Sequence, residues 1–301
     1  MKLTHYLAIA TLLGAAIPAA AQVQLNGAGA TFPNIIYQDW MLTYNQSHPD
    51  VKLNYQSIGS GGGIRQFSDG TVDFGASDAP MTDSAIAAIG GNALHIPTVM
   101  GAVVIIYNLQ GVSQAVKFTP DVLADIFLGK ITKWNDARLA SVNSGVTLPA
   151  SDIVVVHRAD GSGTSFAFTD YLSKVSPEWQ QKVGKGTSVN GPVGLGGRGS
   201  EGVSATVSQM PGAIGYVELA YATTNKTQYG TLRNTSGNWI TPSLDAVTAA
   251  AAGAMKDMGP NTDFRVSVTN SSGAQAYPIS TFTWLLVHKS YSDTAKARAL
   301  V

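Results

Sequence analysis

Residues 157 to 166, with the sequence HRADGSGTSF, bring together the side chains best suited to chemistry in this chain. Arg158 has a planar guanidinium that can bind two oxygens of a phosphate or a carboxylate. The turn at 161–164 adds two hydroxyls and several backbone N–H groups. Where such a turn begins a helix, the first N–H groups lack partners within the helix and the helix dipole is positive. The segment therefore predicts a site for an anion.

The flanking residues predict the elements that would position this turn. The run 153–156 is apolar and β-branched, which is typical of a buried strand. Phe166, Phe168 and Tyr171 have the spacing of one helix face. Arg158 would then end a strand and the turn would begin a helix. On spacing alone, the alternative is an exposed arginine that pairs with Asp160.

Three other segments share this layout of a strand or turn, small polar residues and a helix start. They are GAGATFP at 27–33, IGSGGG at 58–63 and DFGASDAP at 73–80. In open α/β sheets ligands bind beyond the carboxyl ends of the strands, so these loops can converge on one crevice. For each loop taken alone, a helix cap or a flexible turn is the alternative.

The order of the apolar segments predicts an α/β fold. Strands are expected at 51–58 and 72–76, a helix is expected to begin with residues 64–67, and another helix is expected at 81–89. Two longer apolar strands, at 99–107 and 282–287, are expected to cross between two lobes. With 301 residues the chain is long enough for two domains.

Composition excludes several classes of protein. The net charge is zero and only 13% of residues are charged, so a basic surface for nucleic acid or an anionic membrane is absent. The chain has no cysteine, which excludes disulfides, thiolate catalysis and a lipid-anchored cysteine. Its five histidines lack metal-ligand spacing. We expect no metal and no cofactor.

The N-terminus is typical of an exported protein. Lys2 precedes an apolar run at 6–17 and three alanines at 19–21, the pattern of a cleavable signal peptide over residues 1–21. The mature chain is expected to begin near Gln22. No later segment approaches the ~20 apolar residues of a transmembrane helix. We expect a soluble protein of the periplasm.

Four segments together resemble a known family. The motifs at 27–33, 73–80 and 158–166, with PGAIGY at 211–216, are similar in order and spacing to the periplasmic phosphate-binding protein of the phosphate ABC transporter. The resemblance runs from about residue 24 to 289. It implies a type II periplasmic binding protein, with two α/β lobes, a hinge of two crossing strands and phosphate held in the cleft between the lobes. It also implies the permease subunits of an ABC importer as partners, and we expect a monomer.

The resemblance also implies the residues that contact phosphate. Position by position they are Thr31, Phe32, Ser60, Asp78, Arg158, Ser162, Gly163 and Thr164. Asp160 matches an aspartate that holds the arginine in place. The resemblance places residues 22–98 and 278–301 in lobe I and residues 99–277 in lobe II. Family members continue with further helices, so the C-terminal part of lobe I is expected to be incomplete.

Asp78 is the residue that could select the anion. A carboxylate repels an anion unless the ligand supplies a proton between them, which phosphate does at neutral pH and sulfate does not. Two opposed, desolvated acceptors would cost about 3 to 5 kcal/mol, by analogy with an unpaired buried charge. Asp78 thus favours phosphate over sulfate or molybdate. Another tetrahedral oxyanion, such as a phosphonate, is the alternative within this fold, as is a secreted scavenger that works without a transporter.

The alternative from another class is a secreted hydrolase with Ser162 as nucleophile and with His157 and Asp160 nearby. Adjacent residues of a strand point to opposite faces, so His157 should point away from Arg158. The sequence GSG at 161–163 also lacks the Gly-x-Ser-x-Gly pattern of a nucleophile elbow. A second motif, GLGGRG at 194–199, fits Gly-x-Gly-x-x-Gly, but no expected strand leads into it. We interpret it as a structural surface loop and expect no catalytic residue.

Overall fold

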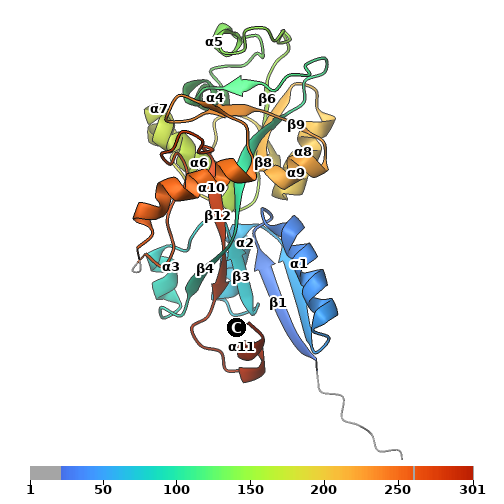
Figure 1. Cartoon of the computed structure of the whole chain (residues 1–301), viewed down its shortest axis with the longest axis vertical. Coiled ribbons are helices and arrows are strands. Elements are labelled where there is room, and N and C mark those ends of the chain that lie inside the picture. The colour runs from blue at the N-terminus through green and yellow to red at the C-terminus, as the bar shows by residue number, and fades with distance from the viewer. Residues whose placement is uncertain (1–21, 260–261, 301) are drawn as a thin grey trace, which may run out of the picture.

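Two lobes, one above the other and joined by two long strands, make up the molecule (Figure 1). The computed structural model describes residues 22–259 and 262–300. The expected signal peptide at 1–21 lies outside the described residues. Within the described ranges no helix is long and apolar enough to cross a bilayer.

Strands and helices alternate along the chain, as an α/β fold requires. The strands are β1 (Val23–Gly29), β2 (Val51–Ser57), β3 (Phe74–Ser77), β4 (Leu94–Tyr107), β5 (Lys117–Phe118), β6 (Val154–Arg158), β7 (Leu195–Gly197), β8 (Ala213–Glu218), β9 (Gln228–Tyr229), β10 (Thr231–Arg233), β11 (Trp239–Ile240) and β12 (Ser280–Val287). The helices are α1 (Asn34–Ser47), α2 (Ser60–Ser68), α3 (Asp83–Ala88), α4 (Pro120–Phe127), α5 (Ala137–Ser141), α6 (Gly163–Val175), α7 (Pro177–Lys182), α8 (Gly199–Gln209), α9 (Leu219–Thr224), α10 (Leu244–Ala254), the 3₁₀ turn η1 (Met255–Asp257) and α11 (Thr294–Leu300).

Strands β4 and β12 connect the two lobes. The first part of β4 pairs antiparallel with β12, and its last five residues, Val103–Tyr107, pair with β8. The strand begins at Leu94, five residues before the start expected from the sequence, and therefore contains Pro97. The register with β12 shifts between Thr283 and Trp284, opposite this proline. Proline lacks an N–H and is tolerated in a strand at such an irregularity.

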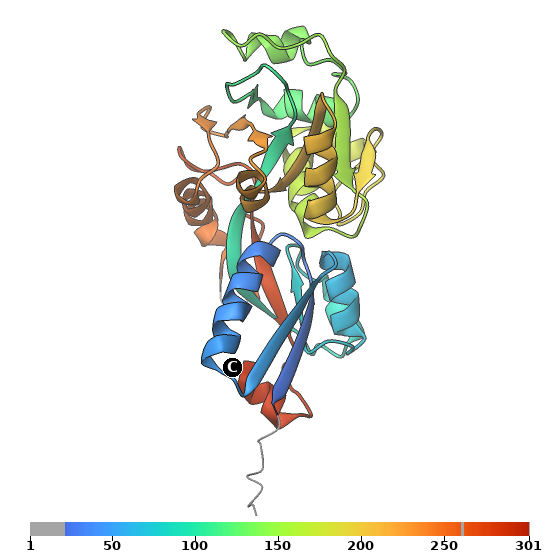
Figure 2. The same cartoon turned by 90° about the vertical axis from the view of Figure 1, so that its right-hand side faces the viewer.

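The lower lobe has a sheet with the strand order β2-β1-β3-β12-β4. Strands β1, β2 and β3 are parallel, so their carboxyl ends lie at one edge of the sheet. Alternate residues of β12 pack on opposite faces: Trp284 and Leu286 pack with Phe67 of α2, whereas Leu285 packs with Phe74. Helices α1 and α2 cover the two faces (Figure 2).

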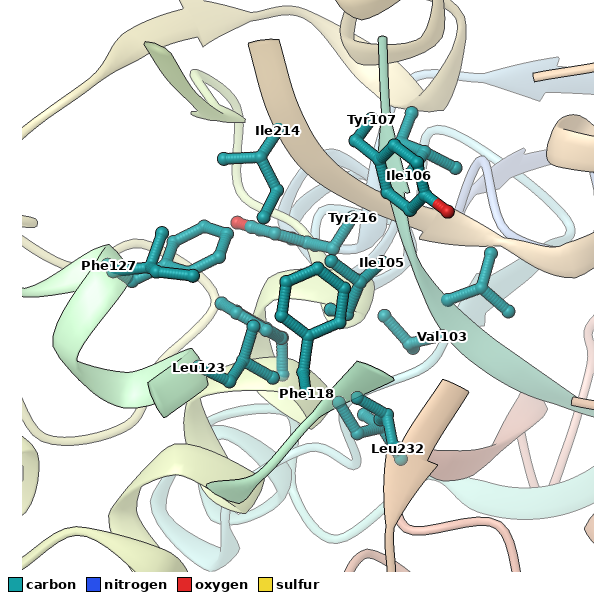
Figure 3. Packing of buried hydrophobic residues seen from close by; sticks show 14 of the residues in the cluster. Val103, Ile105, Ile106, Tyr107, Phe118, Leu123, Phe127, Ile214, Tyr216 and Leu232 are labelled. Atoms are coloured by element: carbon teal, nitrogen blue, oxygen red, sulfur yellow. The ribbon is translucent and has the colours of Figure 1, made fainter. Parts of the chain in front are cut away.

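The upper lobe continues the sheet in the order β4-β8-β6-β7, with β6 parallel to both of its neighbours. Its core contains buried apolar and aromatic side chains from β4, β8 and α4, among them Ile105, Tyr216 and Leu123 (Figure 3). Helix α6 packs against this core through Phe168, which stacks on Tyr216 at 4.2 Å between ring centroids. The core therefore fixes the start of α6 next to the end of β6.

The interpretation of residues 194–199 as a surface loop is wrong. Residues Leu195–Gly197 form strand β7, and helix α8 begins at Gly199. The strand has two glycines and one apolar residue, so its own propensity for strand is low. It forms because it pairs with β6, in the register Val156↔Leu195 to Arg158↔Gly197. This places the start of α8 beside the end of β6.

Candidate anion-binding site

Arg158 is the last residue of β6 and its side chain is only 1% exposed. Nε donates to Oδ1 of Asp160 at 2.8 Å, and Nη2 donates to Oδ2 at 2.5 Å. The arginine is therefore paired with Asp160, as the alternative from spacing proposed, but it is buried. Nη1 lies 3.5 Å from Oγ1 of Thr164. Asp160 thus holds one side of the guanidinium, and the other side faces the start of α6.

Asp160 stays ionised next to this arginine. Burial by itself raises the pKa of Asp160, but the hydrogen bonds and charge of Arg158 outweigh it, together with the backbone N–H of Gly199, so that the pKa lies below its usual value. Because the pair is neutral overall, the positive charge of Arg158 is partly compensated before any ligand binds.

Helix α6 begins with the turn that the sequence singled out. Ser162 is the N-cap residue, and its Oγ accepts a hydrogen bond from the N–H of Ser165 at 3.0 Å. Its hydroxyl hydrogen is left to donate elsewhere. Gly163 and Thr164 are the first helical residues, whose N–H groups have no partner within the helix. All three residues are buried, so this helix start faces the molecular interior.

Asp78 follows β3 and is 1% exposed. Its Oδ1 accepts a hydrogen bond from Thr283 at 2.7 Å, and its Oδ2 lies 3.5 Å from Oγ1 of Thr164. The backbone N–H of Asp78 donates to Oγ of Ser60 at 3.1 Å, at the start of α2. Burial raises the pKa of Asp78 to about 7, against the lowering effects of Thr283, Arg158, Thr164 and Ser60. A carboxyl from the lower lobe therefore faces the helix start and arginine of the upper lobe.

Thr31 and Phe32 lie between β1 and α1, next to α8. Oγ1 of Thr31 is 2.9 Å from Oγ of Ser200 and accepts from the N–H of Ser200 at 3.2 Å. The N–H of Gly199 donates to Asp160 at 2.9 Å, which links this corner to Arg158. The Phe32 side chain is buried in the core, so its backbone is the part that could contact a ligand. The predicted roles of Thr31 and Phe32 stay predictions.

Backbone segments of the two lobes are in contact around the site. The N–H of Gly61 in α2 donates to the carbonyl of Gly161 at 2.8 Å. A Cβ atom on Gly61 would lie 3.1 Å from Cα of Gly161, and one on Gly163 would lie 2.6 Å from Cβ of Asp78. Glycine is thus required at 163, and it permits the close approach at 61. The structure therefore shows the lobes closed on each other here.

The hydrolase alternative finds no support in these contacts. Nδ1 of His157 lies 3.1 Å from the carbonyl of its neighbour Arg158, and Oγ of Ser162 contacts the N–H of Ser165. Among the described residues, no group of three or more His, Cys, Asp or Glu side chains could hold a metal ion.

The chain matches known proteins over nearly its whole length. A family model described as the PBP superfamily domain matches residues 14–299. The phosphate-binding protein PstS of Xylella fastidiosa is 47% identical over 94% of this chain and 77% of its own length. PstS of Pasteurella multocida is 46% identical over 88% of this chain and 76% of its own length.

The chain belongs to the PstS family of the PBP superfamily. Solved structures agree on the fold of this PstS-family chain. A high-affinity periplasmic phosphate-binding protein, PfluDING bound with phosphate, has a TM-score of 0.69 at 24% identity and covers 92% of this chain and 84% of that one. The two-lobed fold predicted from the resemblance is therefore confirmed.

Two side chains that contact the candidate site were not predicted from the sequence. Thr283 reaches Asp78 from β12, and Ser200 reaches Thr31 from the start of α8. Thr283 had a signal: threonines at 281 and 283 alternate with apolar residues in an otherwise apolar crossing strand. Ser200 had only the Gly-Ser pair after Arg198, which indicates a helix start once β7 is known.

Proposed function

We propose that this chain binds inorganic phosphate with high affinity in the periplasm and delivers it to the permease subunits of an ABC importer. The names of its PstS relatives support this function, since they are phosphate-binding proteins. One observation carries the proposal: a buried carboxyl, Asp78, faces a buried arginine, Arg158, across the helix start at Thr164. The family is one of solute-binding proteins, and we assign no catalytic residue.

Attraction and alignment of the anion fall to the upper lobe in this proposal. Arg158 supplies charge and N–H donors, Ser162 and Thr164 supply hydroxyls, and the N–H groups of Gly163 and Thr164 supply further donors. The lower lobe adds the N–H groups of Thr31 and Phe32, with the hydroxyls of Thr31 and Ser60. Asp160 contacts Arg158 and not the ligand.

Selection of the anion falls to Asp78. Dibasic phosphate retains one proton, which it donates to the carboxylate. Sulfate has no proton at neutral pH, so its oxygens and the carboxylate would be opposed without a hydrogen between them. A penalty of about 3 to 5 kcal/mol corresponds to roughly a hundred- to several-thousandfold in affinity. A phosphonate also retains a proton near neutral pH, and a separate titration with a phosphonate distinguishes it from phosphate.

Release of the ion requires that the two lobes move apart. We propose that residues 22–98 and 278–301 form lobe I, that residues 99–277 form lobe II, and that the two lobes separate at β4 and β12 to release the ion.

We also propose that residues 1–21 are a cleaved signal peptide and that the mature protein is a monomer. Mass spectrometry of the exported protein and equilibrium ultracentrifugation test these two statements.

The direct test is calorimetric titration of phosphate into the wild-type protein and the Arg158→Ala variant. We expect one phosphate per chain for the wild type. Loss of charge-assisted hydrogen bonds, each about 1.5 to 3 kcal/mol, should weaken binding by the variant at least tenfold. Affinity within a factor of two of wild type would show that Arg158 is misplaced. A chromogenic phosphate ester incubated with the protein provides the check on enzymatic turnover, which we expect to be absent.

A further inference from the structure

Thr283 is a fully buried polar residue on the crossing strand β12. Its neighbours Phe282 and Trp284 point to the opposite face and pack in the apolar cluster around Phe67. The Thr283 hydroxyl lies 2.7 Å from Oδ1 of Asp78. An ionised carboxylate only accepts, so the hydroxyl is the donor. The strand therefore directs one hydrogen bond at one oxygen of the selecting carboxylate.

This bond decides which oxygen of Asp78 can meet a ligand. Oδ1 is taken by Thr283, whereas Oδ2 faces Thr164 at 3.5 Å, on the side of the α6 start and of Arg158. The backbone of Asp78 is fixed separately, because its N–H donates to Ser60. The carboxylate is thus held with Oδ2 directed towards the upper lobe.

Other charged and titratable groups surround Asp78 from several elements. Arg158 on β6 favours its ionised form. Glu218 at the end of β8, Tyr37 on α1 and Tyr55 on β2 also lie within electrostatic reach of Asp78. Burial raises the pKa of Asp78, and among the effects that oppose burial the hydrogen bond from Thr283 is the largest.

We propose that Thr283 is a specificity-determining positioning residue, whose hydroxyl keeps Asp78 an ionised acceptor and thereby sets how strongly the site excludes anions that have no proton, such as sulfate. The inference rests on the proposed binding of phosphate. It adds a residue that touches no ligand and acts only through Asp78.

The chemistry of the two ions makes this role measurable. In either complex the anion and Asp78 share one proton. Dibasic phosphate brings that proton, whereas sulfate requires that Asp78 be already protonated. Sulfate affinity should therefore fall tenfold for each pH unit above the pKa of Asp78, while phosphate affinity is nearly level above the second pKa of phosphate. Removing the Thr283 hydroxyl should raise the pKa of Asp78 and move the sulfate profile to higher pH.

The experiment is calorimetric titration of sodium sulfate, and separately of sodium phosphate, from pH 6 to 9.5 with wild type and Thr283→Val. Valine keeps the β-branched shape and removes the donor. At pH 8.5 we expect about tenfold tighter sulfate binding by the variant, since a hydrogen bond to a charged group has about that effect on the equilibrium. Phosphate affinity should change less, so the preference for phosphate narrows.

Three further variants control the test. Thr281→Val removes a hydroxyl on the same face of β12 that donates to the carbonyl of Phe282 at 3.2 Å and lies 3.5 Å from the backbone carbonyl of Asp78. Because this hydroxyl contacts the backbone of Asp78 and not its carboxylate, Thr281→Val should leave the pH dependence of sulfate binding unchanged. Thr283→Ser keeps the donor and should restore the wild-type profile. In a Glu218→Gln background, which removes the second buried carboxyl, Thr283→Val should still move the pH profile of sulfate binding to higher pH.

An unchanged sulfate profile in Thr283→Val would overturn the inference, as would an equal shift in Thr281→Val. Failure of the wild type to bind phosphate would instead overturn the proposed function. If Thr283→Val does not fold, Thr283→Ala provides the donor-free comparison with Thr283→Ser.

Discussion

At the scale of residues, two acidic side chains near one arginine have opposite electrostatic behaviour. Asp160 is bonded by Arg158 and by the N–H of Gly199, and its pKa lies below its usual value. Asp78 has no direct bond to the guanidinium, and burial raises its pKa to about 7. The first carboxyl compensates charge, and the second is able to exchange a proton with a ligand near neutral pH. In the proposed site, one carboxyl therefore holds the arginine and the other selects the anion.

These pKa shifts predict how the stability of the ligand-free protein changes with pH. The pKa of Asp78 rises from 3.8 to about 7, and burial raises that of Glu218 from 4.5 to about 7, helped by the charge of Asp78 and opposed by the N–H groups of Ala220 and Leu219. The folded state binds more protons than the unfolded state between these values. The free energy of unfolding should fall as pH rises from about 4.5 to 7. Asp78 should contribute roughly 3 to 4 kcal/mol of this fall.

Urea unfolding at pH 5, 6, 7 and 8 in phosphate-free buffer measures this slope. Asp78→Asn should reduce the slope of the free energy of unfolding against pH by about half. Glu218→Gln should remove much of the remaining slope. Asp170 will not mask the effect: burial raises its pKa, but Lys185, Thr269, Ser267 and Lys174 lower it overall, so its stabilisation is lost only below about pH 4. Equal slopes in wild type and Asp78→Asn would show that Asp78 titrates normally.

At the scale of elements, the first turn of α2 and the turn before α6 limit how closely the lobes approach. Gly61 and Gly161 contact each other through their backbones, with no side chain between them. Because ligand contacts come from both lobes in the proposed site, any atom inserted here should oppose closure and weaken binding.

Gly61→Ala tests this limit. The added methyl would lie 3.1 Å from Cα of Gly161 in the closed structure, a contact that backbone must move to relieve. With about 1 kcal/mol of strain, phosphate affinity should fall about fivefold. The free energy of unfolding without ligand should not fall, because alanine is a better helix former than glycine by about 1 kcal/mol.

Gly62→Ala is the matched control, since the three atoms nearest to its methyl all belong to the flexible Ile58 side chain of the same lobe, with Cδ1 at 2.9 Å. Phosphate titration and urea unfolding of both variants give the comparison. Wild-type affinity in Gly61→Ala would mean that the lobes have more room than this contact indicates.

The sequence predicted local elements well where the pattern is local. The strand at 153–156 and the helix around Phe168 match β6 and α6 to within a few residues, because apolar periodicity determines both. Strand β7 was missed because pairing with β6, and not its own propensity, makes it a strand. The bond from Thr283 to Asp78 joins residues 205 positions apart, which no local pattern encodes. Residue types and spacing alone predicted an anion site at Arg158 and the turn at 161–164, whereas the individual contacts assigned to Thr31, Phe32, Ser60 and Asp78 came from the family resemblance.

At the scale of the whole molecule, a chain of zero net charge encloses a site for an anion. Long-range attraction by net charge is therefore absent. Charge is matched locally instead: Arg158 pairs with Asp160, and in the proposed site Asp78 is matched by a ligand that brings its own proton. Arg158 and Asp78 lie on different lobes, and the paired strands β4 and β12 connect these two lobes (Figure 1).

In the proposed site, Asp78 selects phosphate by accepting a hydrogen bond from the proton that phosphate retains. The most direct test is the ratio of phosphate to sulfate affinity, measured by calorimetry at pH 8 for wild type, Asp78→Asn and Asp160→Asn. The amide introduced by Asp78→Asn would donate to either anion, so the ratio should fall at least tenfold, whereas Asp160→Asn should change both affinities together and keep the ratio. If Asp78→Asn kept the wild-type ratio of phosphate to sulfate affinity, selection of phosphate by Asp78 would be contradicted.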